Sequence, residues 1–306
     1  MIISFDHGNK QIKTIHKTFT SGLCESDTHP PFGRDVLFYN GKYYTLSDQR
    51  IPYMRDKTAD ERFFILTLFA IGFELRRMLV SEDPVKVQLC IGLPPAHFGT
   101  LYQKFEQYFL GRDVQYFQLD GEAHSILITE AVCFPQAYAA AIPAYSKLQQ
   151  LPKAVIVDIG GFTADYLQIK YGQADLSVCD SLENGVIVLY NRIRSKINAN
   201  FDILLDESDI DAILMDKAQE YDEAVCRVVR EQAQLFIDDL TGKLRERMID
   251  QRSGKTVFVG GGSILLRKQI ESCGKIGSAL FVDELDANTK GYELLYRASE
   301  FGGTYA

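Results

Sequence analysis

Residues 154–165 read AVIVDIGGFTAD, and residues 2–13 read IISFDHGNKQIK. Each stretch starts with an apolar run typical of a buried strand, reaches an aspartate, turns on glycine and returns as a second strand. The two aspartates, Asp6 and Asp158, lie about half of the 306-residue chain apart. The sequence therefore predicts a duplicated β-turn-β element, with one copy in each half of the chain.

The glycines in the two turns point to a polyphosphate ligand. A turn without side chains exposes backbone N–H groups that bind phosphate oxygens, and two nearby carboxylates bind a divalent metal ion. The relevant residues are Gly8, Asn9 and Lys10 in the first turn, and Gly160 and Gly161 in the second. The alternative is an ordinary hairpin, because Asp-x-Gly is common after any strand.

A third glycine cluster lies in residues 257–265, which read VFVGGGSIL. The pattern predicts a strand, a turn at Gly260, Gly261 and Gly262, and a helix whose free N–H groups and positive dipole end favour an anion. Leu265 stands where a dinucleotide-binding GxGxxG motif has its last glycine, so the cluster is not that motif. A tight strand-to-helix turn without a ligand is the alternative.

Composition excludes several classes of protein. With 46% hydrophobic and 24% charged residues, the chain is typical of a globular protein with two domains of about 150 residues each. Its net charge of −8 argues against broad binding to nucleic acid. The six cysteines are scattered without metal-ligand spacing, so we expect reduced thiols and a cytoplasmic protein. The apolar stretch 63–75 is shorter than a membrane span, and no secretory signal is expected.

Periodicity predicts the elements between the glycine motifs. Asn40 and Gly41 predict a hairpin within residues 36–45, and Thr58 and Glu61 predict a capping box before a buried helix. The further predicted elements are helices at 63–75, 99–110, 135–145, 185–198, 221–248 and 288–301, and strands at 85–93, 125–132 and 256–259. Both halves thus contain strands followed by helices, which indicates two mixed α/β domains.

The order of these motifs resembles that of the actin-fold ATPases. Residues 6–13, 158–165 and 260–262 are similar to the phosphate-1, phosphate-2 and adenosine motifs of that superfamily, and residues 134–140 and 287–291 to its connecting motifs. The resemblance covers nearly the whole chain. It implies an α/β, actin-like fold, in which a ribonuclease H-like domain is duplicated and two domains surround a nucleotide cleft.

The resemblance also implies where the two domains lie. Domain I is expected at residues 1–150, with a C-terminal helix at 288–306 packing back on it, and domain II at residues 151–287.

Within the superfamily, residues 89–94, which read LCIGLP, and the helix expected at 102–110 look like the plasmid-segregation proteins of the ParM/StbA type. That family implies a filament that grows with nucleotide bound, hydrolyses it, and moves DNA through an adaptor protein on a plasmid centromere. No direct contact with nucleic acid or membrane is expected. Segments 21–60 and 200–220 carry no recognisable family motif, so they leave filament geometry and adaptor choice open.

The resemblance assigns roles to four residues. Asp6 and Asp158 are expected to hold Mg²⁺ mainly through coordinated water, and Asp158 also to orient the attacking water. Lys13 is expected at the phosphates, with a solvent-facing strand position as the alternative. Gln136 is expected to hold the water, because phosphoryl transfer depends more on positioning than on a strong base. A plain polar residue at a helix start is the alternative for Gln136.

A larger group of residues is expected to contact the nucleotide, which is ATP or ADP, with GTP as the alternative. They are Gly8, Asn9, Lys10, Lys13, Gly160, Gly161, Thr163, Gly185, Gly260, Gly261, Gly262, Ser263 and Leu265. Thr163 is expected at a phosphate oxygen and Gly185 close to the sugar.

Three functions compete on this fold. The first is a polymerising, ATP-driven cytoskeletal protein for DNA segregation. The second is a small-molecule kinase, which needs a carboxylate base and larger substrate-binding insertions; Gln136 and the short chain speak against it. The third is a non-polymerising relative of the chaperone or cell-division type, in which nucleotide moves the domains and a partner reads the movement.

Overall fold

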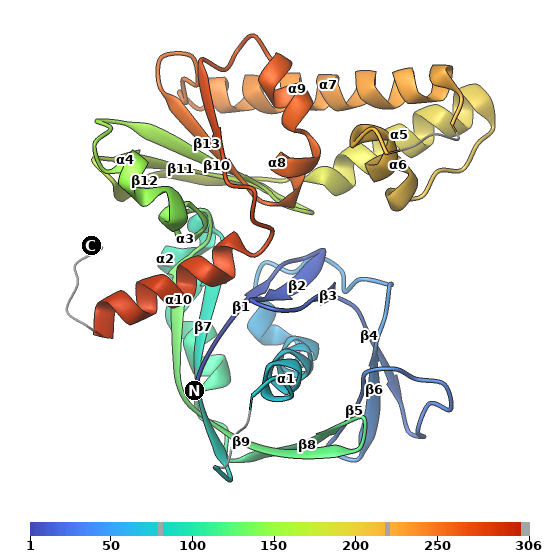
Figure 1. Ribbon diagram of the computed structural model, residues 1–306, viewed down its shortest axis with the longest axis vertical. Coiled ribbons are helices and arrows are strands. Elements are labelled where there is room, and N and C mark those ends of the chain that lie inside the picture. The colour runs from blue at the N-terminus through green and yellow to red at the C-terminus, as the bar shows by residue number, and fades with distance from the viewer. Residues whose placement is uncertain (79–81, 218–220, 301–306) are drawn as a thin grey trace. The chain divides into compact units, whose positions relative to one another are not determined.

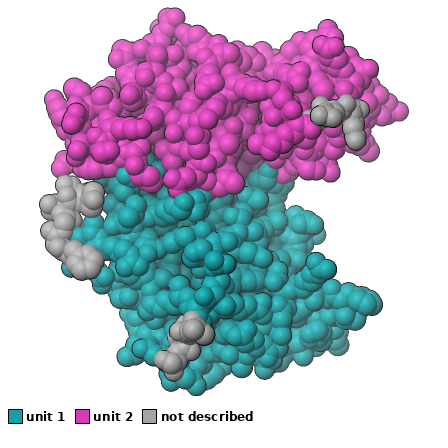
Figure 2. Space-filling model, viewed as in Figure 1, with its two compact units in different colours: residues 1–142, 286–306 teal, residues 143–285 magenta. Residues whose placement is uncertain are grey.

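The computed structural model describes residues 1–78, 82–217 and 221–300, and the chain forms two compact units (Figure 2). Unit 1 comprises Met1–Ile142 and Asp286–Ala306, and unit 2 comprises Pro143–Leu285. The chain therefore returns to unit 1 for its last helix, α10 (Ala287–Glu300). Residues 301–306 of the expected terminal segment lie outside the described residues.

Unit 1 is built on one mixed sheet (Figure 1). Its strands are, in sheet order, β3 (Thr18–Thr20), β2 (Gln11–Thr14), β1 (Ile2–His7), β7 (Val85–Leu93), β9 (Glu122–Pro135), β8 (Gln115–Leu119), β5 (Val36–Tyr39), β6 (Lys42–Leu46) and β4 (Leu23–Ser26). The predicted hairpin joins β5 to β6, and its residues Asn40 and Gly41 both have positive φ, as a tight two-residue turn requires.

The sheet of unit 1 curls around helix α1 (Arg62–Leu75) (Figure 1). Every residue from Phe63 to Leu75 is buried, which explains why the helix is apolar on all sides. The predicted capping box is wrong. The Asp60 carboxylate accepts the backbone N–H of Arg62 at 3.0 Å, while Thr58 belongs to the short 3₁₀ helix η1 (Lys57–Ala59).

Helix α2 (Pro95–Phe109) starts earlier than predicted. Pro95 stands in its first turn, where a missing N–H costs nothing and a fixed φ favours the helix. The predicted helix at 135–145 is wrong, because the chain forms three short pieces: α3 (Tyr138–Ala141), η2 (Ile142–Ala144) and α4 (Tyr145–Leu148). Pro143 in the middle removes a backbone donor and breaks the helix.

Helix α10 packs against α3 and the strands β1 and β7 of unit 1. Tyr292 and Tyr296 are buried in a small cluster with Cys90 and Ala139. Gly291 permits this contact, since a Cβ atom at that position would lie 1.9 Å from the carbonyl oxygen of Ala139. The close approach fixes the segment that follows β9.

Unit 2 contains a smaller mixed sheet covered by helices (Figure 1). Its strands are, in sheet order, β12 (Gln173–Leu182), β11 (Ala164–Lys170), β10 (Ala154–Ile159), β13 (Lys255–Val259) and β14 (Ser278–Phe281). Its helices besides α4 are α5 (Val186–Phe201), α6 (Glu207–Leu214), α7 (Glu223–Glu246), α8 (Gly261–Leu265) and α9 (Arg267–Ser272). Alternate residues of β10, such as Val155 and Val157, join a core with Leu189 of α5 and Phe236 of α7. None of the helices in the described residues is long and apolar enough to cross a membrane.

Candidate functional site

The first glycine turn joins β1 to β2 in unit 1. Asp6 and Lys13 are direct partners across these antiparallel strands, so their side chains lie on the same face of the sheet. Asp6 is 7% exposed and Lys13 is partly exposed. Gly8 is required by the turn itself, because a Cβ there would lie 2.5 Å from the carbonyl oxygen of Gln11. Asn9 and Lys10 complete the turn, and both are partly exposed.

Gln136 lies against Asp6 in the same unit. Its amide nitrogen Nε2 donates to Oδ1 of Asp6 at 2.6 Å, and Gln136 is 8% exposed. The backbone N–H of Gln136 donates to the carbonyl of Leu93 at 2.8 Å, where β7 ends. The next residue, Ala137, has a φ of 63° and donates its N–H to Oδ1 of Asn288 at 3.1 Å. The α10 segment thus helps to hold Gln136 in place.

The geometry settles the orientation of the Gln136 amide. An ionised carboxylate has no hydrogen to donate, so the amide nitrogen must face Asp6. In the described part of the chain Oε1 of Gln136 accepts no hydrogen bond. This oxygen is therefore available to accept a hydrogen from a water molecule.

The second glycine turn joins β10 to β11 in unit 2. The N–H of Gly160 donates to the carbonyl of Thr163 at 2.8 Å and closes the turn. Asp158, which is nearly buried, faces Asp165 across the two strands. The Thr163 hydroxyl donates to Asp165 at 3.1 Å, and the Ser181 hydroxyl donates to the other oxygen of the same carboxylate. Asp165 therefore fixes Thr163, while Gly160 and Gly161 are partly exposed.

Gly185 lies directly on the second turn, at the start of α5. The N–H of Gly185 donates to the carbonyl oxygen of Phe162 at 2.9 Å. The N–H of Ile187 donates to the carbonyl oxygen of Gly161, also at 2.9 Å. A Cβ at Gly185 would lie 2.4 Å from the carbonyl oxygen of Gly161. Packing of two backbone segments thus requires glycine here, before any ligand is considered.

The third glycine cluster meets the second turn in unit 2. Gly260 has a φ of 85°, and a Cβ there would lie 2.2 Å from Oδ1 of Asp158. At Gly262 the obstacle would be the carbonyl oxygen of Ile159 at 2.6 Å. Around Gly261 there is more room. Asp158 is therefore held beside a backbone that has no space for side chains.

The remaining predicted residues belong to α8. Ser263 is fully buried, and its hydroxyl donates to the carbonyl of Val259 at 2.6 Å, which joins the helix to β13. Leu265 packs at the edge of the hydrophobic core of unit 2. The contacts of both side chains are thus with the protein itself.

Unit 1 brings together Asp6, Lys13, Gln136 and the first turn. Unit 2 brings together Asp158, Gly185, the second turn and the third glycine cluster.

Family comparisons agree with this division. The family described as actin-like proteins, N-terminal domain, matches residues 4–138, and the family described as archaeal actin homologue MreB-like, C-terminal, matches residues 156–272. The chain is an actin-like protein. Comparison of this actin-like protein with curated protein sequences finds no significant match.

Solved structures confirm the actin-like fold. The archaeal actin homologue Ta0583 in complex with ADP is 19% identical, with a TM-score of 0.75 over 97% of this chain and 99% of that chain. A subunit of the 15-stranded ParM filament from Clostridium botulinum is 17% identical, with a TM-score of 0.74 over 97% and 98%. Bacillus thuringiensis ParM with ATP is 12% identical, with a TM-score of 0.69 over 98% of both chains. At these identities the likeness shows that the three proteins and this chain share one fold.

The structure draws attention to two lysines that the sequence analysis missed. Lys57 is buried, and its ammonium group donates to the carbonyl oxygen of His7, directly before the first turn. Lys243 of α7 donates to Oδ1 of Asn184 at 2.8 Å, and Asn184 precedes Gly185. Lys57 stands in a polar segment without periodicity and Lys243 in a charged helix, so nothing in the sequence singled them out.

Proposed function

We propose that this actin-like protein binds and hydrolyses ATP, with GTP as the alternative, and assembles into filaments when nucleotide is bound. We further propose that the filaments move plasmid DNA through a DNA-binding adaptor. Supporting relatives of the same fold include Ta0583 in complex with ADP, ParM with ATP, and the ParM filament. The net charge of −8 supports an adaptor rather than direct contact with DNA.

The hydrogen bond between Gln136 and Asp6 carries the proposal for hydrolysis. It joins the residue expected to hold the attacking water to a carboxylate expected to hold the metal, although the two are far apart in the sequence. The bond fixes the amide and leaves Oε1 to orient a water molecule. Holding a nucleophile in line is the main contribution that a protein makes to phosphoryl transfer.

Magnesium fits the carboxylates of the proposed set. Within the described residues no group of three or more His, Cys, Asp or Glu side chains is arranged to hold a metal ion. Mg²⁺ does not need such a group, because it keeps several waters and binds one or two carboxylates together with phosphates. Asp6 and Asp158, each beside a glycine turn, would hold it in this way. When bound, the ion neutralises charge on the phosphate oxygens.

The other residues bind and orient the nucleotide. Lys13 shares a face of the sheet with Asp6 and supplies a positive charge for the phosphates. The backbone N–H groups of the glycine turns approach phosphate without obstruction by side chains. The Thr163 hydroxyl donates to Asp165, so it would have to give up this bond before it could donate to a phosphate oxygen at the second turn. A small-molecule kinase is less well supported, because position 136 carries an amide instead of a base.

Right-angle light scattering with phosphate release in the same sample tests the proposal. On addition of Mg-ATP, we expect scattering to rise above a critical protein concentration and to decay as phosphate appears, and a parallel series with GTP establishes the preferred base. Phosphate release without scattering would contradict filament assembly and favour the non-polymerising type. Neither signal with either nucleotide would overturn the proposal as a whole.

A further inference from the structure

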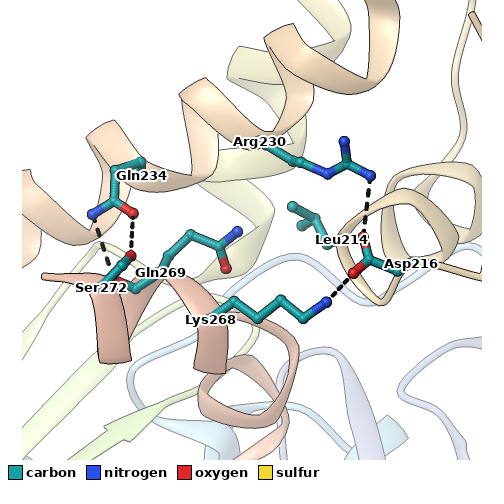
Figure 3. Close-up of a pocket in the computed structure, with 7 residues that line it drawn as sticks. All are labelled: Leu214, Asp216, Arg230, Gln234, Lys268, Gln269 and Ser272. Carbon is teal, nitrogen blue, oxygen red and sulfur yellow. Dashed lines mark hydrogen bonds and ion pairs between the residues drawn. The ribbon is translucent and has the colours of Figure 1, made fainter. Parts of the chain in front are cut away.

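A pocket of about 680 Å³ opens between helices α7 and α9 of unit 2 (Figure 3). Its lining residues are Leu214, Asp216, Arg230, Gln234, Lys268, Gln269 and Ser272. None of them belongs to the glycine turns or to the residues proposed to bind nucleotide. The volume is in the range of sites that hold small molecules or single peptide side chains with their backbone.

One end of the pocket is closed by a bridge of charges. The Asp216 carboxylate, just beyond α6, accepts from Nη2 of Arg230 at 3.1 Å through one oxygen and from the Lys268 ammonium through the other (Figure 3). Two cations thus share one anion, which leaves one unit of positive charge. In the part of the chain that the structure describes, Arg230 makes no other hydrogen bond, so most of its N–H donors remain available.

The rest of the pocket contains an unsatisfied amide. Gln269 is only 7% exposed, and its side-chain oxygen Oε1 has no hydrogen-bond partner among the described residues. Its side chain lies in the middle of the pocket, between the charged bridge and the Gln234–Ser272 pair (Figure 3). That pair is tied by a 2.9 Å hydrogen bond from the Ser272 hydroxyl. A buried amide oxygen without a donor is costly, so a ligand that brings a donor to Oε1 would be favoured at this position.

We propose that this pocket binds an acidic peptide segment of a partner protein. A Glu or Asp carboxylate of the segment binds Arg230 and Lys268 beside Asp216, where a planar guanidinium suits it. The N–H of the peptide backbone donates to Oε1 of Gln269, whose terminal torsion is soft enough to turn toward it. A bare anion satisfies the two cations but brings no N–H for the amide.

Fluorescence anisotropy of a labelled, acetylated and amidated tetra-glutamate peptide with the full chain tests the proposal. We expect saturable binding that weakens as salt is raised. Lys268→Ala and Arg230→Ala should each weaken binding by about tenfold, because each leaves the bound carboxylate with one cation fewer. Lys170→Ala is the matched control. Lys170 is an exposed lysine at the end of β11, and its ammonium group pairs with the Asp175 carboxylate at 2.7 Å. The substitution removes the same charge as the two pocket variants and should leave binding unchanged.

Gln269→Met separates ligand binding from a structural role. The variant keeps the length of the side chain and removes the unpaired amide, so it should fold at least as stably while binding the peptide several-fold more weakly. Unchanged affinity in Gln269→Met would overturn the role of the amide, and absence of wild-type binding would overturn the site. Displacement of the peptide by an equimolar amount of inorganic phosphate would overturn its assignment to a peptide. None of these outcomes depends on nucleotide hydrolysis or filament assembly.

Discussion

The side-chain amide of Gln136 donates a 2.6 Å hydrogen bond to the carboxylate of Asp6, across 130 positions of sequence. Both side chains are nearly buried, so the pair is protected from competition by bulk water. The hydrogen bond to Asp6 therefore determines how the side-chain amide of Gln136 is oriented. It follows that removal of the amide should impair hydrolysis without removing the nucleotide.

We expect Gln136→Ala to lower the rate of phosphate release by about 10- to 100-fold, because the water loses the group that positions it. ADP affinity, measured by isothermal titration calorimetry, should change by less than about threefold, because the interactions that hold the nucleotide in its ground state are not affected. Gln118→Ala is the control, because Gln118 is an exposed glutamine on β8 of the same sheet. Equal phosphate release from wild type and Gln136→Ala would contradict the assigned role.

Lys13 offers a second test within unit 1. Lys13→Ala should weaken ATP binding by about tenfold, since a charge-assisted contact to phosphate is lost. Lys17→Ala serves as the control. Lys17 is the next lysine of the same segment and pairs with Asp35 only at 4.0 Å, so its loss should change affinity by less than about twofold. Similar losses of ATP affinity in both variants would show that Lys13 contributes only to the overall positive charge of the segment and makes no specific contact with phosphate.

The sequence predicted the elements whose signals are local. The β1–β2 and β10–β11 hairpins, helix α1, the β5–β6 hairpin and the strand β13 all lie within a few residues of the expected positions. Each has a strong short-range cause: an apolar run, an Asn-Gly turn or a glycine cluster. The actin-like fold followed from the order of these motifs and is confirmed.

Elements with weak local signals were missed. Strand β12 lies at a sheet edge, and most of its residues are partly exposed, so it shows no clear apolar pattern. Helix α6 lies in the segment where no motif was recognised, although Asp206 and Asp209 form a capping box that predicts its start. No pattern in the sequence predicts the contact of Gln136 with Asp6, because the contact depends on the order of strands in the sheet, where β7 lies between β1 and β9.

Asp158 provides the corresponding test in unit 2. We expect Asp158→Ala to abolish phosphate release while part of the nucleotide binding remains, because the glycine turns still offer their N–H groups. Phosphate release and binding of a fluorescent ATP analogue measure the two properties separately. Asp180→Ala is the control, since Asp180 is a more exposed aspartate on β12 that pairs with Arg247 at 3.3 Å. Undiminished phosphate release from Asp158→Ala would remove this residue from the proposed site.

Gly260 tests whether the position of Asp158 matters as much as its charge. In Gly260→Ala, the new Cβ would lie 2.2 Å from Oδ1 of Asp158, at a backbone φ of 85° that alanine rarely adopts. We expect a loss of about 1–3 kcal/mol in the free energy of unfolding together with a large loss of phosphate release. Gly254→Ala is the matched control, because nothing lies within 4 Å of a Cβ there. Normal hydrolysis by Gly260→Ala would show that Asp158 tolerates displacement.

Lys57 links the stability of unit 1 to its first glycine turn. Its ammonium group donates to the carbonyl oxygen of His7, and it lies 5.6 Å from the centre of the Phe63 ring. His7 itself is fully buried, and its Nε2 bonds the Thr67 hydroxyl at 2.9 Å. The end of β1 is therefore fixed by a buried cation on one side and by α1 on the other.

We expect Lys57→Met to lower the free energy of unfolding by about 1–3 kcal/mol, because it leaves the His7 carbonyl without this donor in a buried position. Methionine fills a similar volume over the Phe63 ring, so the loss measures the hydrogen bond more than the packing. Urea unfolding gives the midpoint and the slope, and only the midpoint should fall. Lys104→Met is the control, since Lys104 is an exposed lysine whose ion pair with Asp56 has a length of 2.6 Å.

A Lys57→Met variant as stable as wild type would mean that the cost of burying the ammonium group cancels the contribution of its hydrogen bond. The lysine would then be kept for its charge next to the turn, and ATP affinity should fall even though stability does not.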